Sequence, residues 1–159
     1  MPRLLMALGL VALLGACDPL DAEIDFASFE KTDASNQYLV CPPDYCRAPA
    51  DEASPVFALP APALAAIARR VVESEPRTVL LREQVATGQR VYVQRSLVFR
   101  FPDTIWIQVL PVDANRSTLA IYSRSAYGRY DFGVNRSRVQ DWLAAVVAAA
   151  SAGAANGGG

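Results

Sequence analysis

The 159-residue sequence predicts an α+β fold, a two-layer sandwich in which two helices cover one face of a roughly four-stranded antiparallel sheet. Apolar residues recur at helical spacing in two segments, which flank a central stretch rich in Val, Ile, Leu and aromatic residues. Short turn-forming sequences interrupt this central stretch, and strands joined by short links pair antiparallel. The predicted order is therefore helix, meander, helix.

The first predicted helix follows a connection rich in Ala and Pro, residues 48–62, which disfavours regular structure. Apolar side chains then recur at helical spacing, at Leu64, Ile67, Ala68, Val71 and Val72. Pro76 ends this helix because proline lacks the backbone N–H and its ring clashes with the preceding turn. The helix has one apolar face to bury.

The strand-like segments follow Pro76, and all are rich in β-branched, aliphatic and aromatic residues. They are residues 78–85, 89–95, 96–101, 104–112 and 117–125. Turn-forming sequences occupy residues 86–88, 101–103 and 113–115. Residues 89–101 form either one long bent strand or two.

The second predicted helix extends from about residue 136 to residue 150, with Asn135 as a candidate N-cap. Its apolar side chains are Val139, Trp142, Leu143, Val146 and Val147. Residues 151–159 are small and show no apolar periodicity, so we expect a disordered tail.

The N-terminus has the layout of a secretory signal peptide. Arg3 is followed by an unbroken apolar run over residues 4–16, which is too short to span a bilayer core that needs about 20 residues. The run ends in Leu-Gly-Ala-Cys, which resembles the bacterial lipobox and implies a diacylglycerol on Cys17. We therefore expect residues 1–16 to be removed, and the mature protein to contact the membrane through this lipid anchor.

Asp18 follows the lipidated cysteine directly. An acidic residue at this position resembles the signal that keeps enterobacterial lipoproteins in the inner membrane. The expected location is therefore the bacterial cell envelope, with the periplasmic face of the inner membrane favoured over the outer membrane.

Charge divides the rest of the chain. Residues 18–52 contain nine acids against Lys31 and Arg47, whereas residues 53–159 contain seven acids against twelve arginines. We interpret residues 17–35 as an acidic, solvated tether and residues 36–150 as a single domain.

Cys41 and Cys46 are the remaining cysteines. An exported chain meets an oxidising compartment, so we expect them to form a disulfide. Two thiols in a chain without histidine supply too few ligands for a zinc site, and no metal or cofactor is predicted.

The segment from Ser123 to Arg138 resembles the signature of the DUF1499 family, proteins of unknown function. The matching residues are Ser123, Ser125, Gly128, Asp131, Gly133, Asn135 and Arg138, while Ala126 stands where the family pattern has Arg. The resemblance extends over roughly residues 36–147 and implies no reaction.

The same segment carries a candidate anion site. With Asn135 as N-cap, Arg136 and Arg138 lie in the first helical turn, where cations are unfavourable to the helix dipole unless an anion is near. Arginines and exposed helix N–H groups there suit a carboxylate or phosphate. The candidate ligand-binding residues are Ser123, Arg124, Ser125, Arg129, Asp131, Asn135, Arg136 and Arg138. The alternative is that carboxylates pair with these arginines and lock the strand-to-helix junction.

These patterns favour a non-catalytic envelope module that binds an anionic small molecule, a lipid headgroup or an envelope protein. A structural or assembly lipoprotein that presents its sheet to an envelope complex is the main alternative. The absence of histidine leaves only carboxylates and tyrosines for acid and base chemistry, so an enzyme is less favoured, and no catalytic residue is assigned. Arginines scattered among apolar strands also argue against nucleic acid as a partner.

Overall fold

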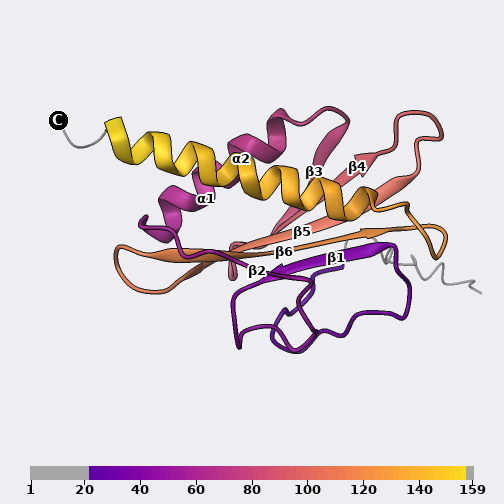
Figure 1. Cartoon of the computed structure of the whole chain (residues 1–159), viewed down its shortest axis with the longest axis horizontal. Coiled ribbons are helices and arrows are strands. Elements are labelled where there is room, and N and C mark those ends of the chain that lie inside the picture. The colour runs from indigo at the N-terminus through magenta and orange to yellow at the C-terminus, as the bar shows by residue number, and fades with distance from the viewer. Residues whose placement is uncertain (1–21, 157–159) are drawn as a thin grey trace, which may run out of the picture.

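A computed structural model describes residues 22–156, which form a six-stranded sheet and two helices that lie on the same side of it (Figure 1). The strands are β1 (Gln37–Cys41), β2 (Glu52–Ala53), β3 (Thr78–Glu83), β4 (Arg90–Arg95), β5 (Pro102–Pro111) and β6 (Ser117–Ser125). The helices are α1 (Ala61–Ser74) and α2 (Val134–Asn156). The predicted signal peptide and Cys17 lie outside the described residues.

The sheet has the strand order β2-β1-β6-β5-β4-β3 and is mixed. The predicted α+β class with two helices is confirmed, but the predicted four-stranded antiparallel sheet is wrong in strand number and direction. The four strands from β3 to β6 form the expected antiparallel meander. Two further strands extend it, because β1 pairs antiparallel with β6 and the short β2 pairs parallel with β1.

Residues 96–101 form a turn rather than the predicted strand. The N–H of Ser96 donates to the carbonyl of Phe101 at 2.9 Å, which closes the loop, and Arg100 adopts a positive φ of 58°. The chain therefore reverses between β4 and β5 and leaves a loop rich in apolar side chains at this end of the sheet.

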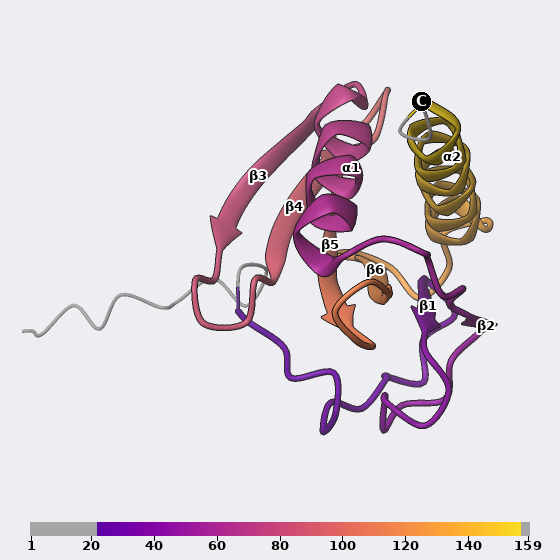
Figure 2. The same cartoon turned by 90° about the vertical axis from the view of Figure 1, so that its left-hand side faces the viewer.

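Both helices pack on one face of the sheet (Figure 2). α1 buries Leu64, Ala68 and Val72, which are spaced one helical turn apart. α2 contributes Trp142 and its apolar neighbours to the same core. The sheet side chains that meet the helices include Tyr92, Ile105, Ile107, Leu119 and Ile121.

The other face of the sheet is covered by the N-terminal segment (Figure 2). Phe26 is completely buried there and joins Leu39, Trp106 and Tyr122 in a second apolar cluster. The indole N–H of Trp106 donates to the carbonyl of Ala22 at 2.8 Å. From residue 22 onward, the segment predicted to be a solvated tether is thus a packed arm, because its few apolar side chains cover the second sheet face.

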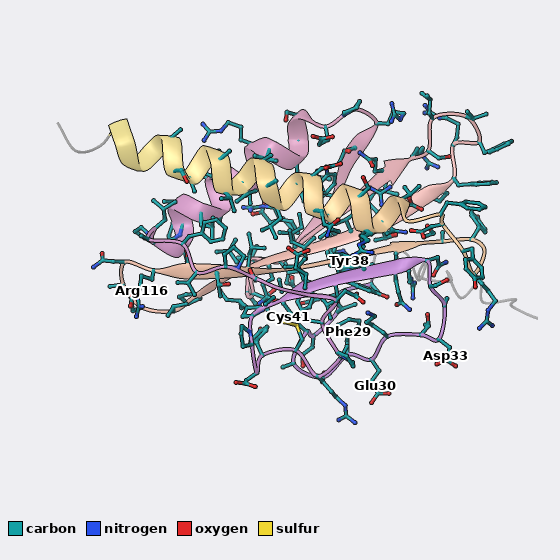
Figure 3. All side chains as sticks on the ribbon, viewed as in Figure 1. Phe29, Glu30, Asp33, Tyr38, Cys41 and Arg116 are labelled. Atoms are coloured by element: carbon teal, nitrogen blue, oxygen red, sulfur yellow. A yellow bond between two sulfur atoms is a disulfide. The ribbon has the colours of Figure 1, made fainter. Side chains whose placement is uncertain are left out.

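The predicted disulfide between Cys41 and Cys46 is present and closes a loop after β1 (Figure 3). Cys41 is buried in the second apolar cluster, so the disulfide attaches this loop to the covered face. Within the described chain, neither helix is long and apolar enough to cross a bilayer.

α2 begins two residues earlier and ends later than predicted. It continues to Asn156, so residues 151–156 are helical rather than part of a disordered tail. Alanine has the highest helix propensity, and the Ala-rich sequence after Trp142 sustains the helix through Gly153.

Two buried tyrosines should respond in opposite ways to removal of the hydroxyl group. The Tyr92 hydroxyl is buried without a hydrogen-bond partner, whereas the Tyr122 hydroxyl donates to Gln37 Oε1 at 2.5 Å. Tyr92→Phe should raise the free energy of unfolding by about 1 kcal/mol, and Tyr122→Phe should lower it by about 1–2 kcal/mol. Urea unfolding at pH 7 measures both changes, and equal effects of the two substitutions would contradict this assignment.

Burial raises the pKa of Tyr92 and that of Tyr122 to about 12. The folded state therefore keeps protons that the unfolded chain releases above about pH 10. Stability should be intact below about pH 10 and fall as the pH rises toward 12. The decline, followed by urea unfolding across this range, should be smaller in the Tyr92→Phe variant.

Candidate functional site

A buried polar network joins the end of β6 to the start of α2. Asn135 is completely buried, and its side-chain carbonyl accepts a hydrogen bond from Ser123 Oγ at 2.6 Å. Its amide nitrogen lies 2.9 Å from the carbonyl of Asn36 and 2.9 Å from Ser125 Oγ. Asn135 therefore connects α2 to both β6 and the residue that precedes β1.

Arg138 lies at the centre of this network, with only 7% of its surface exposed. Its Nη2 forms an ion pair with Asp103 Oδ2 at 2.6 Å, and its Nε donates to Gln94 Oε1 at 2.6 Å. Its Nη1 donates to Ser123 Oγ at 2.9 Å and to Asn135 Oδ1 at 2.7 Å. The guanidinium thus ties α2 to β4, β5 and β6, and its hydrogen-bonding edges are already occupied.

Asp131 caps the start of α2. One carboxylate oxygen accepts the N–H of Gly133 at 3.0 Å, and the other accepts the N–H of Asn135 at 2.8 Å. The backbone reaches this cap through positive φ angles of 54° at Phe132 and 79° at Gly133. The predicted N-cap at Asn135 is wrong, because α2 begins at Val134 and the side chain of Asn135 points into the network; the Asp131 carboxylate binds the N–H groups at the helix start instead.

The structure does not bring the four candidate arginines together. Arg124 lies on the covered sheet face, with its guanidinium carbon 5.9 Å from the centroid of the Trp106 ring. Arg136 lies 5.8 Å from the centroid of the Tyr38 ring, and Arg129 is exposed in the loop after β6. With Arg138 paired to Asp103, this geometry favours the alternative in which the junction is locked by its own charges.

A pocket of about 460 Å³ lies at the same end of the sheet, between the β4–β5 loop and the β6–α2 loop. Both loops lie at the right-hand end in Figure 1. The lining residues are Ser96, Phe99, Phe101, Asp103, Ser125, Tyr127, Gly128, Tyr130, Asp131, Phe132 and Val134. We call this the aromatic pocket. The polar network forms part of its lining, because Asp103, Ser125 and Asp131 belong to both.

The walls of the aromatic pocket are exposed aromatic rings, from 51% exposure at Phe101 to 99% at Phe132. The ring centroids of Phe99 and Phe101 are 5.5 Å apart, and those of Phe101 and Tyr127 are 5.8 Å apart. Contiguous exposed apolar surface of this kind marks interaction sites. The pocket was not predicted from the sequence, because aromatic residues at strand-like positions are typical of core or cross-strand pairs.

The polar groups of the pocket are few. No group of three potential metal ligands occurs within residues 22–156. The two pocket carboxylates already make structural bonds, Asp103 to Arg138 and Asp131 to the backbone of α2. The pocket combines apolar walls with a few polar groups, which is the usual make-up of a small-molecule site.

Measurements of stability can distinguish the buried network, which includes Arg138 and Asp131, from the exposed Arg136. Arg138→Met should lower the free energy of unfolding by about 3–5 kcal/mol, because it leaves the buried Asp103 carboxylate unpaired. Asp131→Ala should lower it by about 1–3 kcal/mol through loss of the cap. Arg136→Ala should change it by less than about 1 kcal/mol, since a weak ring contact and an unfavourable helix-dipole interaction are lost together. Equal losses for Arg136→Ala and Arg138→Met in urea unfolding would contradict the network.

Comparison with known proteins places the chain in a family. No curated protein matches the chain. Similar solved structures include BexL, a di-domain aromatase/cyclase of the BE-7585A biosynthetic pathway, with 13% identity and a TM-score of 0.41 over 58% of this chain. The match covers 43% of BexL, so the chain spans less than half of its length.

A solution structure from Thermobifida fusca matches at 13% identity and a TM-score of 0.37, over 58% of this chain and 75% of that one. The Zhui aromatase/cyclase from Streptomyces sp. R1128 matches at 16% identity and a TM-score of 0.27, over 65% of this chain and 86% of that one. The family model described as "Protein of unknown function (DUF1499)" matches residues 28–146. Because this match covers well over half of the sequence, the protein belongs to the DUF1499 family.

Proposed function

We propose that the protein is a non-catalytic, lipid-anchored binding module of the bacterial cell envelope, and that the aromatic pocket is its ligand site. The observation that carries this proposal is the exposure of five aromatic rings around one pocket: Phe99, Phe101, Tyr127, Tyr130 and Phe132. Exposed aromatic side chains are costly in water, and the polar network holds the pocket that they line in place. The lipobox at Cys17 supports the anchor.

The contacts of the N-terminal segment that precedes β1 support a location of the aromatic pocket at the end of the domain away from the lipid anchor. Glu23 contacts Gln84 and Thr87 in the turn between β3 and β4, at the opposite end of β4 from the aromatic pocket. Five residue steps separate Cys17 from Ala22, and an extended chain of that length spans at most about 17 Å. A lipid on Cys17 would therefore hold the β3–β4 end near the membrane.

The main alternative, a lipoprotein that presents its sheet to an envelope complex, loses support from the fold. The helices cover one sheet face and the arm covers much of the other. The aromatic pocket, rather than a sheet face, is the surface that this domain offers to a ligand.

Lipidation is tested with the Cys17→Ser variant expressed in bacteria with radiolabelled palmitate. We expect label in the wild-type protein and none in the variant, which should also remain an uncleaved precursor. Label in both proteins would show that the acyl chain is not on Cys17.

The ligand site is tested with the neutral apolar dye N-phenyl-1-naphthylamine, whose fluorescence rises in an apolar site. Phe99→Ser should reduce the affinity of the lipidated protein for the dye by about fivefold or more, because it removes an aromatic wall. Val98→Ser is the matched control, since Val98 is equally exposed in the same loop, at 75% against 73% for Phe99, but does not line the pocket. Equal losses in the two variants would mean that the dye binds to the loop surface rather than the pocket.

A further inference from the structure

The charge of the aromatic pocket is opposite to that expected from the nearby sequence. Its lining includes two acids, Asp103 and Asp131, and no basic residue. Arg138, which pairs with the lining residue Asp103, is buried, and its guanidinium points into the network. An anion in this pocket would therefore meet carboxylates rather than the guanidinium groups that sequence analysis predicted.

Asp103 is more than nine-tenths buried and keeps one acceptor unused. Its Oδ2 pairs with Arg138, while its Oδ1 accepts no hydrogen bond from the residues that the structure describes. Asp131 adds a second negative charge, since its oxygens accept only neutral groups, the N–H groups of Gly133 and Asn135 and the side-chain amide of Asn135, and form no ion pair within residues 22–156. The negative charge of the two lining carboxylates is thus only partly neutralised, because the Arg138 guanidinium pairs with Asp103 alone.

The walls add a second preference for positive charge. An aromatic ring carries negative charge on its face, so several rings around one space attract a cation without the need for hydrogen bonds. The stacked pair Phe99 and Phe101, with Tyr127 beside it, lines the space next to these carboxylates. Aromatic rings combined with a carboxylate are the arrangement that recognises ammonium groups.

We infer that the aromatic pocket binds a small organic cation, an alkyl or quaternary ammonium compound. This inference rests on the proposed function, because it names the class of ligand for the same site. The arginines at this end, Arg95, Arg100 and Arg129, do not line the pocket. Arg100 and Arg129 each lie between two lining residues along the chain, and all three arginines are exposed to solvent, where their charges are screened by salt.

Choline and its neutral isostere 3,3-dimethyl-1-butanol test this inference, because the two molecules have nearly the same shape and differ in charge. Titration calorimetry of the full lipidated protein in detergent should give a dissociation constant for choline about tenfold lower than that for the isostere. Equal affinities would overturn the cation inference while leaving the proposed apolar binding site intact. Absence of binding by both probes, or preferential binding of hexanoate, would overturn it as well.

The Tyr127→Leu variant distinguishes attraction of a cation by the aromatic ring face from simple apolar packing of the ligand. Tyr127 is 62% exposed, so the substitution should not disturb the fold, which circular dichroism can check. We expect choline to bind about fivefold more weakly and the isostere to bind within about twofold of its original affinity. Val98→Ser is the control and should leave both affinities unchanged. Equal weakening of both probes by Tyr127→Leu would contradict a role for the ring face in binding a cation.

Discussion

The ion pair between Arg138 and Asp103 is the interaction on which this end of the domain depends. Both side chains are buried, and a buried charge is costly unless it is paired and hydrogen-bonded. Arg138 meets this condition through Gln94, Ser123 and Asn135. The position of α2 on the sheet is therefore set by directional polar bonds as well as by the apolar core, whose contacts alone would tolerate small shifts along the helix axis.

This constraint explains how a loop-built pocket can have a defined shape. Loops usually have higher mobility than the elements that they connect. Here Asp103 is the second residue of the strand after one pocket loop, and Asp131 caps α2 from near the end of the other loop. The network thus fixes the bases of both loops, and the aromatic rings extend from them. The residues of the DUF1499 signature act in this account as the support of the pocket rather than as direct contacts for an anion.

Local patterns in the sequence were sufficient for α1, the antiparallel meander and the disulfide, because each depends on neighbouring residues. β1 was missed because its five residues lie at the start of the predicted domain, inside the acidic stretch of residues 18–52 where no strand was predicted, although all five are buried. Arg138 was misread for a related reason. At a helix start it is locally unfavourable, and its partner Asp103 lies 35 residues away in the sequence. The exposed loop between β4 and β5 was predicted as a strand because composition does not reveal which side chains face water.

Hydrogen exchange measured by mass spectrometry can show whether the Arg138 network supports the aromatic pocket. In the Arg138→Met variant, under conditions where it remains folded, the bonded amides of Phe101, Ala126 and Asn135 should exchange much faster than in the wild-type protein. The amides that pair β5 with β6 at the far end of the sheet should keep their protection. Unchanged exchange in the two pocket loops would contradict this role of the network, because the pocket would then hold its shape without it.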